Sequence, residues 1–160
     1  MSHEKDLFLG FWDKEAAATR KVLSRIPDGS DYRPDPRSRT AREIAWTIVR
    51  EEIVLGDGLE KGVLEWADVP TPATMKEVLA TYDRHHDDLT RRMHALEAAR
   101  WEKPVPFMYG GQEVMKETGY QNAWGFLFDI IHHRGQISTY LRPMGSTVPQ
   151  IYGPSADEPM

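Results

Sequence analysis

Asp129 and His133 are the two residues whose types and spacing point most directly to chemistry. They stand four apart in a stretch with helical apolar spacing, so both side chains lie on one face of a helix. A carboxylate and an imidazole that converge within one turn can bind a divalent metal. Asp129 can equally accept a hydrogen bond from His133 without any metal, because a buried imidazole needs a partner. The spacing leaves both interpretations open.

Glu51, its neighbour Glu52 and His86 could add to such a site. Glu51 lies one turn after Thr47 on the predicted inward face, where a carboxylate is costly unless it is paired. Glu51 could be a metal ligand or a general base, or it could form a salt bridge at the solvent-exposed end of the fold. The pattern favours His86 as a core histidine bonded to a neighbour, and the alternative is a ligand that faces His133. The predicted catalytic residues are Glu51 and His133, and the predicted metal ligands are Asp129, His133, Glu51 and His86.

Three other residues in and after the stretch of Asp129 and His133 are not expected to be catalytic. His132 points about 100° away from His133, which indicates an exposed or interface position. Arg134 and Arg142 are interpreted as surface or tail-binding residues.

Four segments have the three-and-four spacing of apolar residues that is typical of helices. Thr40 and Glu43 have capping-box spacing at the start of the second segment. Glycines and prolines make residues 100–117 a predicted loop, and the last sixteen residues a predicted extended tail. The predicted helices are residues 4–26, 40–59, 71–99 and 118–144. The sequence therefore predicts an all-α, antiparallel four-helix bundle with an extended C-terminal tail, as a single domain over 1–160.

Composition narrows the classes of function. The chain has 160 residues, 40% hydrophobic, with a net charge of -5, which suits one soluble domain. No basic stripe or bilayer-length apolar run is found, so neither a nucleic-acid partner nor a membrane partner is expected. The absence of cysteine excludes disulfides and thiolate nucleophiles. Residues 1–20 lack a secretory apolar region, so Met1 is expected to start the mature protein, in the cytoplasm.

Three stretches carry a resemblance to a known family: residues 33–46 (RPDPRSRTAREIAW), 129–142 (DIIHHRGQISTYLR) and 148–157 (VPQIYGPSAD). Through them the chain resembles the DinB-like (DinB/YfiT) superfamily of bacterial four-helix proteins, over almost its whole length. The resemblance implies a homodimer and a metal, nickel or zinc, held by three histidines.

The metal ligands implied by the resemblance are only partly present in this chain. His133 matches the second ligand of the last helix, Asp129 occupies the position of the first, and Thr47 occupies the position of the helix-two histidine. A carboxylate can replace imidazole, whereas a threonine hydroxyl is a poor ligand for zinc or nickel. Glu51 or His86 could compensate for the missing histidine.

Three hypotheses about function follow. The first is a divalent-metal-dependent enzyme that binds a small-molecule ligand near His133. Some relatives are thiol-dependent transferases, so the ion would activate a thiol, or water in a hydrolase. The second is a non-catalytic binding or stress-response protein with a degenerate metal site. The third is a scaffold that dimerises through helix faces carrying Trp12 or Trp46.

Overall fold

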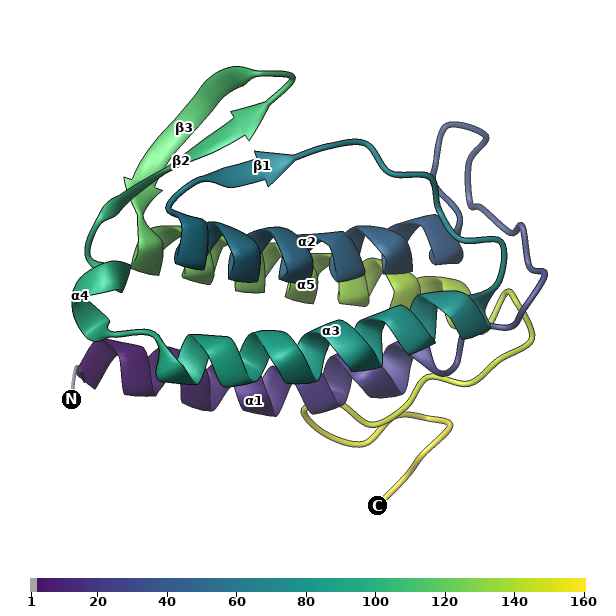
Figure 1. Cartoon of the computed structure of the whole chain (residues 1–160). Helices are drawn as coiled ribbons and strands as arrows, with labels where there is room; N and C mark the ends of the chain where they lie inside the picture. The colour runs from purple at the N-terminus through teal and green to yellow at the C-terminus, as the bar shows by residue number, and fades with distance from the viewer. Residues whose placement is uncertain (1–2) are drawn as a thin grey trace.

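The computed structural model describes residues 3–160, so the predicted start at Met1 lies outside the described part. Four long helices lie alongside one another, with α2 packed on α3 and α5, and α1 on the same two helices (Figure 1). Within residues 3–160, no helix is both long and apolar enough to cross a bilayer. The helices are α1 (His3–Leu23), α2 (Ala41–Lys61), α3 (Met75–Ala95), the short α4 (Ala98–Trp101) and α5 (Gly119–Leu141).

Three of the long helices begin with a capping box, in which two side chains satisfy the first free backbone donors. The box predicted at Thr40 and Glu43 is confirmed. Thr74, and not Thr71, caps α3, so this helix begins later than predicted. Thr118 caps α5 and is also the last residue of the strand that precedes this helix. Three predicted helix ends were too late, because α1, α3 and α5 stop at Leu23, Ala95 and Leu141, and the predicted end of α2 at residue 59 was two residues too early.

A three-stranded sheet corrects the all-α prediction. The fold is predominantly helical, but the sheet has the order β1-β2-β3, with β1 parallel to β2 and β2 antiparallel to β3. In Figure 1 it covers the α2 and α5 side of the helices, away from α1 and α3. The strands are β1 (Leu64–Trp66), β2 (Pro104–Tyr109) and β3 (Gln112–Thr118).

The loop predicted over 100–117 was wrong for a specific reason. Pro104 and Pro106 argue against a strand, but β1 pairs only with residues 107–109, so both prolines lie where β2 has no partner on that side. Gly110 and Gly111 have φ of 57° and 79°, the left-handed values that a two-residue hairpin turn needs. The segment is therefore a β-hairpin.

Two glycines near the end of α2 allow close packing. A Cβ at Gly56 would lie 1.8 Å from Leu89 Cδ1 of α3, and one at Gly58 would lie 2.2 Å from Leu64 Cδ2 of β1. These glycines do not end the helix, which continues to Lys61. They set the distance between α2, α3 and the sheet, and so the position of the α2 side chains between them.

The C-terminal tail has no helix or strand within the described residues, as predicted, and is fixed to the helices by polar contacts. Arg134 of α5 is only 2% exposed, which corrects the surface interpretation. It forms an ion pair with Glu15 of α1 at 2.7 Å and donates to the Tyr152 hydroxyl in the tail. Arg142 binds the tail at Asp157, at 3.0 Å. The tail-binding interpretation is therefore correct for both arginines.

Candidate metal centre

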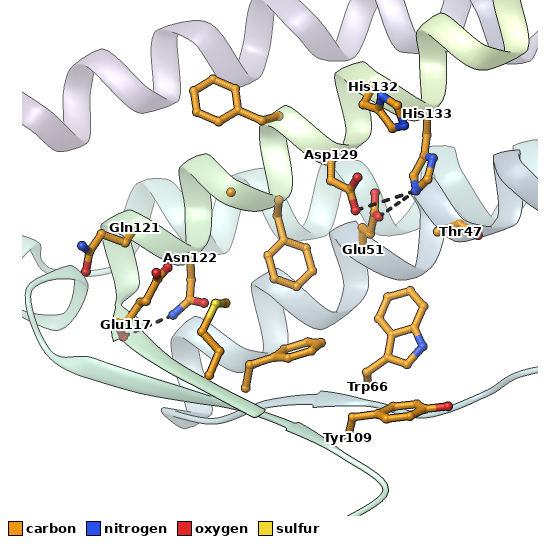
Figure 2. A pocket seen from close by; sticks show the side chains of 15 residues that line it. Thr47, Glu51, Trp66, Tyr109, Glu117, Gln121, Asn122, Asp129, His132 and His133 are labelled. Atoms are coloured by element: carbon orange, nitrogen blue, oxygen red, sulfur yellow. Dashed lines mark hydrogen bonds and ion pairs between the residues drawn. The ribbon is translucent and has the colours of Figure 1, made fainter. Parts of the chain in front are cut away.

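Glu51, Asp129 and His133 meet between α2 and α5. His133 Nε2 lies 3.5 Å from Glu51 Oε1 and 3.7 Å from Asp129 Oδ2 (Figure 2). One ligand atom from each of the three residues lies within 4.8 Å of the other two, so the group could hold a metal ion. The i, i+4 prediction for Asp129 and His133 is confirmed, and Glu51 joins them from the neighbouring helix. We call these three residues the triad.

Hydrogen bonding sets the orientation of the His133 ring. Its Nδ1 lies 3.0 Å from the Gln136 side-chain oxygen, which can only accept, so Nδ1 carries the proton. Nε2 then presents its lone pair toward Glu51 and Asp129. Histidine ligands of metals commonly donate their second ring N–H to an oxygen in this way.

The triad places two carboxyl groups together in a poorly solvated position. Glu51 and His133 are 3% and 8% exposed, while Asp129 is open to the pocket. Burial, then hydrogen bonding and repulsion from Asp129, raise the pKa of Glu51 to about 10, against the attraction of Arg39. Without a cation, Glu51 is therefore protonated at neutral pH.

The donor atoms fit a divalent cation. Glu51 Oε2 is buried and has no hydrogen-bond partner among residues 3–160. A cation would supply that missing partner and offset the repulsion between Glu51 and Asp129. Two carboxylates and one imidazole are ordinary ligands for divalent transition metals.

The structure does not bring His86 to the triad. Its Nδ1 lies 2.9 Å from Oε2 of Glu52, which faces α3 whereas Glu51 faces α5. The ring is stacked between Trp12 and Tyr82, with centroid distances of 5.9 and 5.4 Å. His86 is thus half-buried, covered by two aromatic rings and bonded to a neighbour.

Thr47 also stays outside the triad. Its hydroxyl accepts a hydrogen bond from Arg39 Nη1 at 2.7 Å and donates to the Glu43 carbonyl at 3.1 Å. Glu51, one turn later on α2, reaches α5 in its place. His132 is exposed, as predicted, and lies at the edge of the same pocket.

A pocket of about 690 Å³ opens beside the triad, between α2, α5 and the sheet (Figure 2). Its apolar wall is mostly aromatic, and four of the six apolar residues come from the strands. The hairpin was predicted as a loop, so these residues were missed, although the Gly110-Gly111 pair flanked by apolar residues was a usable hairpin signal. The apolar wall residues are Trp66, Phe107, Tyr109, Met115, Phe126 and Phe128.

Asn122 fixes the sheet above the pocket. Its side-chain amide donates to the carbonyls of Val105, Glu117 and Thr118 at 3.1 to 3.2 Å. One buried residue of α5 therefore holds both hairpin strands. No local pattern around Asn122 indicates this role, because its partner strands were not predicted.

The comparisons with known proteins agree with this architecture. The chain is 29% identical over 160 residues to the uncharacterized protein YrdA of Bacillus subtilis, covering 96% of this chain and 90% of that protein. Among solved structures, it is similar to a DinB-like protein from Bacillus cereus ATCC 10987, with a TM-score of 0.74, 23% identity, and coverage of 91% of this chain and 95% of that one.

A second solved structure is the DinB-like protein YjoA from Bacillus subtilis. Its TM-score is 0.71 at 16% identity, and the match covers 91% of this chain and 97% of that one. At these identities the two structures support the fold alone. The family model described as the DinB family matches residues 1–160. The chain therefore belongs to the DinB family.

Proposed function

We propose that this protein is a divalent-metal-dependent enzyme that acts on a small molecule held in the pocket beside His133. The observation that carries the proposal is the convergence of Glu51, Asp129 and His133 at an apolar pocket, with a buried Glu51 oxygen that lacks a partner. A bound ion would act as a Lewis acid and lower the pKa of a thiol or of water. The reaction would be a thiol-dependent transfer or a hydrolysis.

The protein's own side chains divide the remaining work. His133 is held in the productive tautomer by Gln136, and Glu51, once an ion has displaced its proton, would serve as a ligand or as a general base. Asp129, which is exposed, closes the triad on the pocket side. The aromatic walls would contact the apolar part of the bound small molecule.

Nickel and zinc are the first ions to consider, because imidazole suits both. Manganese is added, since two of the three donors are carboxylates. The proposal takes the four long helices as the antiparallel bundle typical of the family, with the triad between two of them.

The direct test is metal binding by protein purified without a histidine tag. Calorimetry with zinc, nickel and manganese should give one ion per chain, and Glu51→Gln, Asp129→Asn and His133→Asn should each weaken binding about 100-fold or more. His132→Ala is the matched control, because it removes an imidazole from the same pocket but not from the triad. Absence of binding for all three ions, or an equal loss in His132→Ala, would overturn the proposal.

A non-catalytic binding protein with a degenerate metal site is the second candidate. Thr47 favours it, because its hydroxyl is already engaged by Arg39 and Glu43 where the resemblance places a ligand histidine. A protonated Glu51 beside Asp129 would also be a stable arrangement without metal. Tight stoichiometric binding of any of the three ions would exclude this candidate.

The homodimer stays a prediction, and an aromatic surface on α1 and α5 supports it. Phe11 and Phe128 are 44% and 62% exposed, and the ring of Trp124 contacts both. Trp12, considered from the sequence, is buried and so lies outside any such surface. Light scattering should give a dimer mass for the native chain and a monomer mass for Phe11→Glu. A native monomer at high concentration would contradict the prediction.

A further inference from the structure

A second pocket adjoins the first. It has a volume of about 590 Å³ and shares two wall residues, Thr47 and Trp66, with the pocket of the triad. It lies between the first half of α2 and the segment 66–71 that follows β1. A ligand longer than the first pocket would therefore extend past Thr47 and Trp66 into this second space.

Two guanidinium groups line the second pocket, from Arg39 and Arg50. Arg39 donates to Thr47 and lies close enough to Glu51 to lower the pKa of that carboxyl, although burial and Asp129 outweigh it. Arg50 donates only a long hydrogen bond of 3.5 Å to the Ala67 carbonyl, and its buried Nε has no partner among residues 3–160.

Neither guanidinium forms an ion pair with a described carboxylate, unlike those of Arg20, Arg25, Arg37, Arg91, Arg92, Arg134 and Arg142. Both charges in this pocket therefore remain available to a ligand.

Two carboxylates in the same pocket do not satisfy these arginines. Glu43 is held by the helix cap, where it accepts from the Thr40 backbone and hydroxyl at 2.6 and 2.9 Å. Asp68 is exposed and lies 3.5 Å from the Tyr109 hydroxyl. Their charges limit the positive potential of the pocket, which suits a singly charged ligand better than a phosphate dianion. Guanidinium matches a carboxylate through paired N–H donors.

We propose that the second pocket is a carboxylate-binding subsite, and that the ligand of this protein is an organic monoacid. Its carboxylate would lie between Arg39 and Arg50, and its apolar or aromatic part would pass Trp66 into the first pocket, next to the triad. The position of the reacting group rests on the proposed function, whereas the recognition of the carboxylate does not.

The test compares two probes of equal shape, 4-phenylbutyrate and its neutral amide, in protein treated with a chelator. Trp46 and Trp66 line the second pocket, so tryptophan fluorescence reports binding there. The carboxylate should bind about tenfold more tightly than the amide. Arg39→Gln and Arg50→Gln should each remove this preference, and Arg50→Lys should keep part of it because the charge remains.

Arg42→Gln is the matched control, because Arg42 is on the same helix but donates to the Pro72 carbonyl outside the pocket. It should keep the full preference, and thermal unfolding should show that every variant is folded. Equal binding of acid and amide by the native protein, or an equal loss in Arg42→Gln, would overturn the inference.

Metal titration of the same samples separates this inference from the proposed function. A carboxylate preference in a protein that binds none of the three ions would leave the subsite standing and reject the metal enzyme. Metal binding without a carboxylate preference would reject the subsite and leave the proposed metal enzyme standing. Arg50→Gln should keep the metal affinity of the native protein, because it contributes no atom to the triad.

Discussion

Two successive glutamates of α2 each meet a histidine, on opposite sides of the helix. Glu51 faces His133 of α5 at 3.5 Å, and Glu52 faces His86 of α3 at 2.9 Å. Both carboxylates are buried to nearly the same extent. The residue types are the same, but the second pair is closer and the surroundings of the two pairs differ.

The surroundings separate a candidate centre from a structural pair. His86 is covered by two aromatic rings, and its Nε2 lies 3.4 Å from the Thr90 hydroxyl, so the pair is closed and satisfied. The Glu51 pair has a further carboxylate, Asp129, an unpartnered oxygen and an open pocket. Residue types alone therefore do not identify a functional site; access and an unsatisfied donor or acceptor do.

Breaking the closed pair should produce the largest effect. Glu52→Ala leaves the half-buried His86 without its partner, which should cost about 3 kcal/mol of unfolding free energy in urea denaturation. Metal affinity should not change, because Glu52 is outside the triad. A loss of metal binding in folded Glu52→Ala would contradict the separation of the two pairs.

The open pair should respond to pH through metal binding. The pKa of Glu51 is raised to about 10, so a cation must displace its proton at neutral pH. Metal affinity should rise about tenfold per pH unit between about pH 7 and pH 9, with about one proton released per ion. Calorimetry in buffers of different ionisation enthalpy measures this proton. A pH-independent affinity over that range would show that Glu51 is not a ligand.

Glu51→Gln should not destabilise the metal-free protein, although it replaces a buried carboxyl group. In the metal-free protein, the raised pKa of Glu51 makes the native state hold a proton that the unfolded chain releases above pH 4.5. Because of Glu51, the unfolding free energy of the native protein falls steadily as pH rises from 4.5 to about 10, and this fall is absent in Glu51→Gln. The variant should be at least as stable as the native protein at pH 7, by an amount that widens toward pH 9. If urea denaturation showed that this difference in unfolding free energy becomes smaller toward pH 9, the prediction would be contradicted.

The smallest expected effect compares one threonine at each pair. Thr90 accepts from Nε1 of the buried Trp12 at 3.0 Å, so Thr90→Val should cost about 1 kcal/mol of unfolding free energy. Thr47 is half-buried like Thr90, but its donor Arg39 is exposed to water, so Thr47→Val should cost clearly less. Equal costs would mean that the two sites are enclosed to the same degree.

Local signals in the sequence brought together two of the three triad residues. Asp129 and His133 follow from helical spacing, and the Thr40 cap follows from its Glu43 partner. Glu51 was a candidate, but its meeting with His133 depends on how α2 and α5 are aligned, which no local pattern encodes. The same limit applies to His86, whose predicted core position was consistent with a partner on either neighbouring helix.

The sheet was missed because two local rules conflicted. The prolines of β2 argued for a loop, and the Gly110-Gly111 pair argued for a hairpin turn. The prolines are tolerated because β1 is too short to pair with them. Because the sheet was not predicted, the aromatic walls of the first pocket and the position of the second pocket beside β1 were not predicted either.

His133 and Arg134 are consecutive, so one turn of α5 presents an imidazole to the pocket and a guanidinium to the far side of the helix. That guanidinium is clamped by Glu15 and by Tyr152, close to the C-terminus. The rotation of α5 about its own axis is thus restrained from behind the centre. Trimming the chain before Tyr152 would leave all three triad residues present and remove one of the two side chains that restrain Arg134.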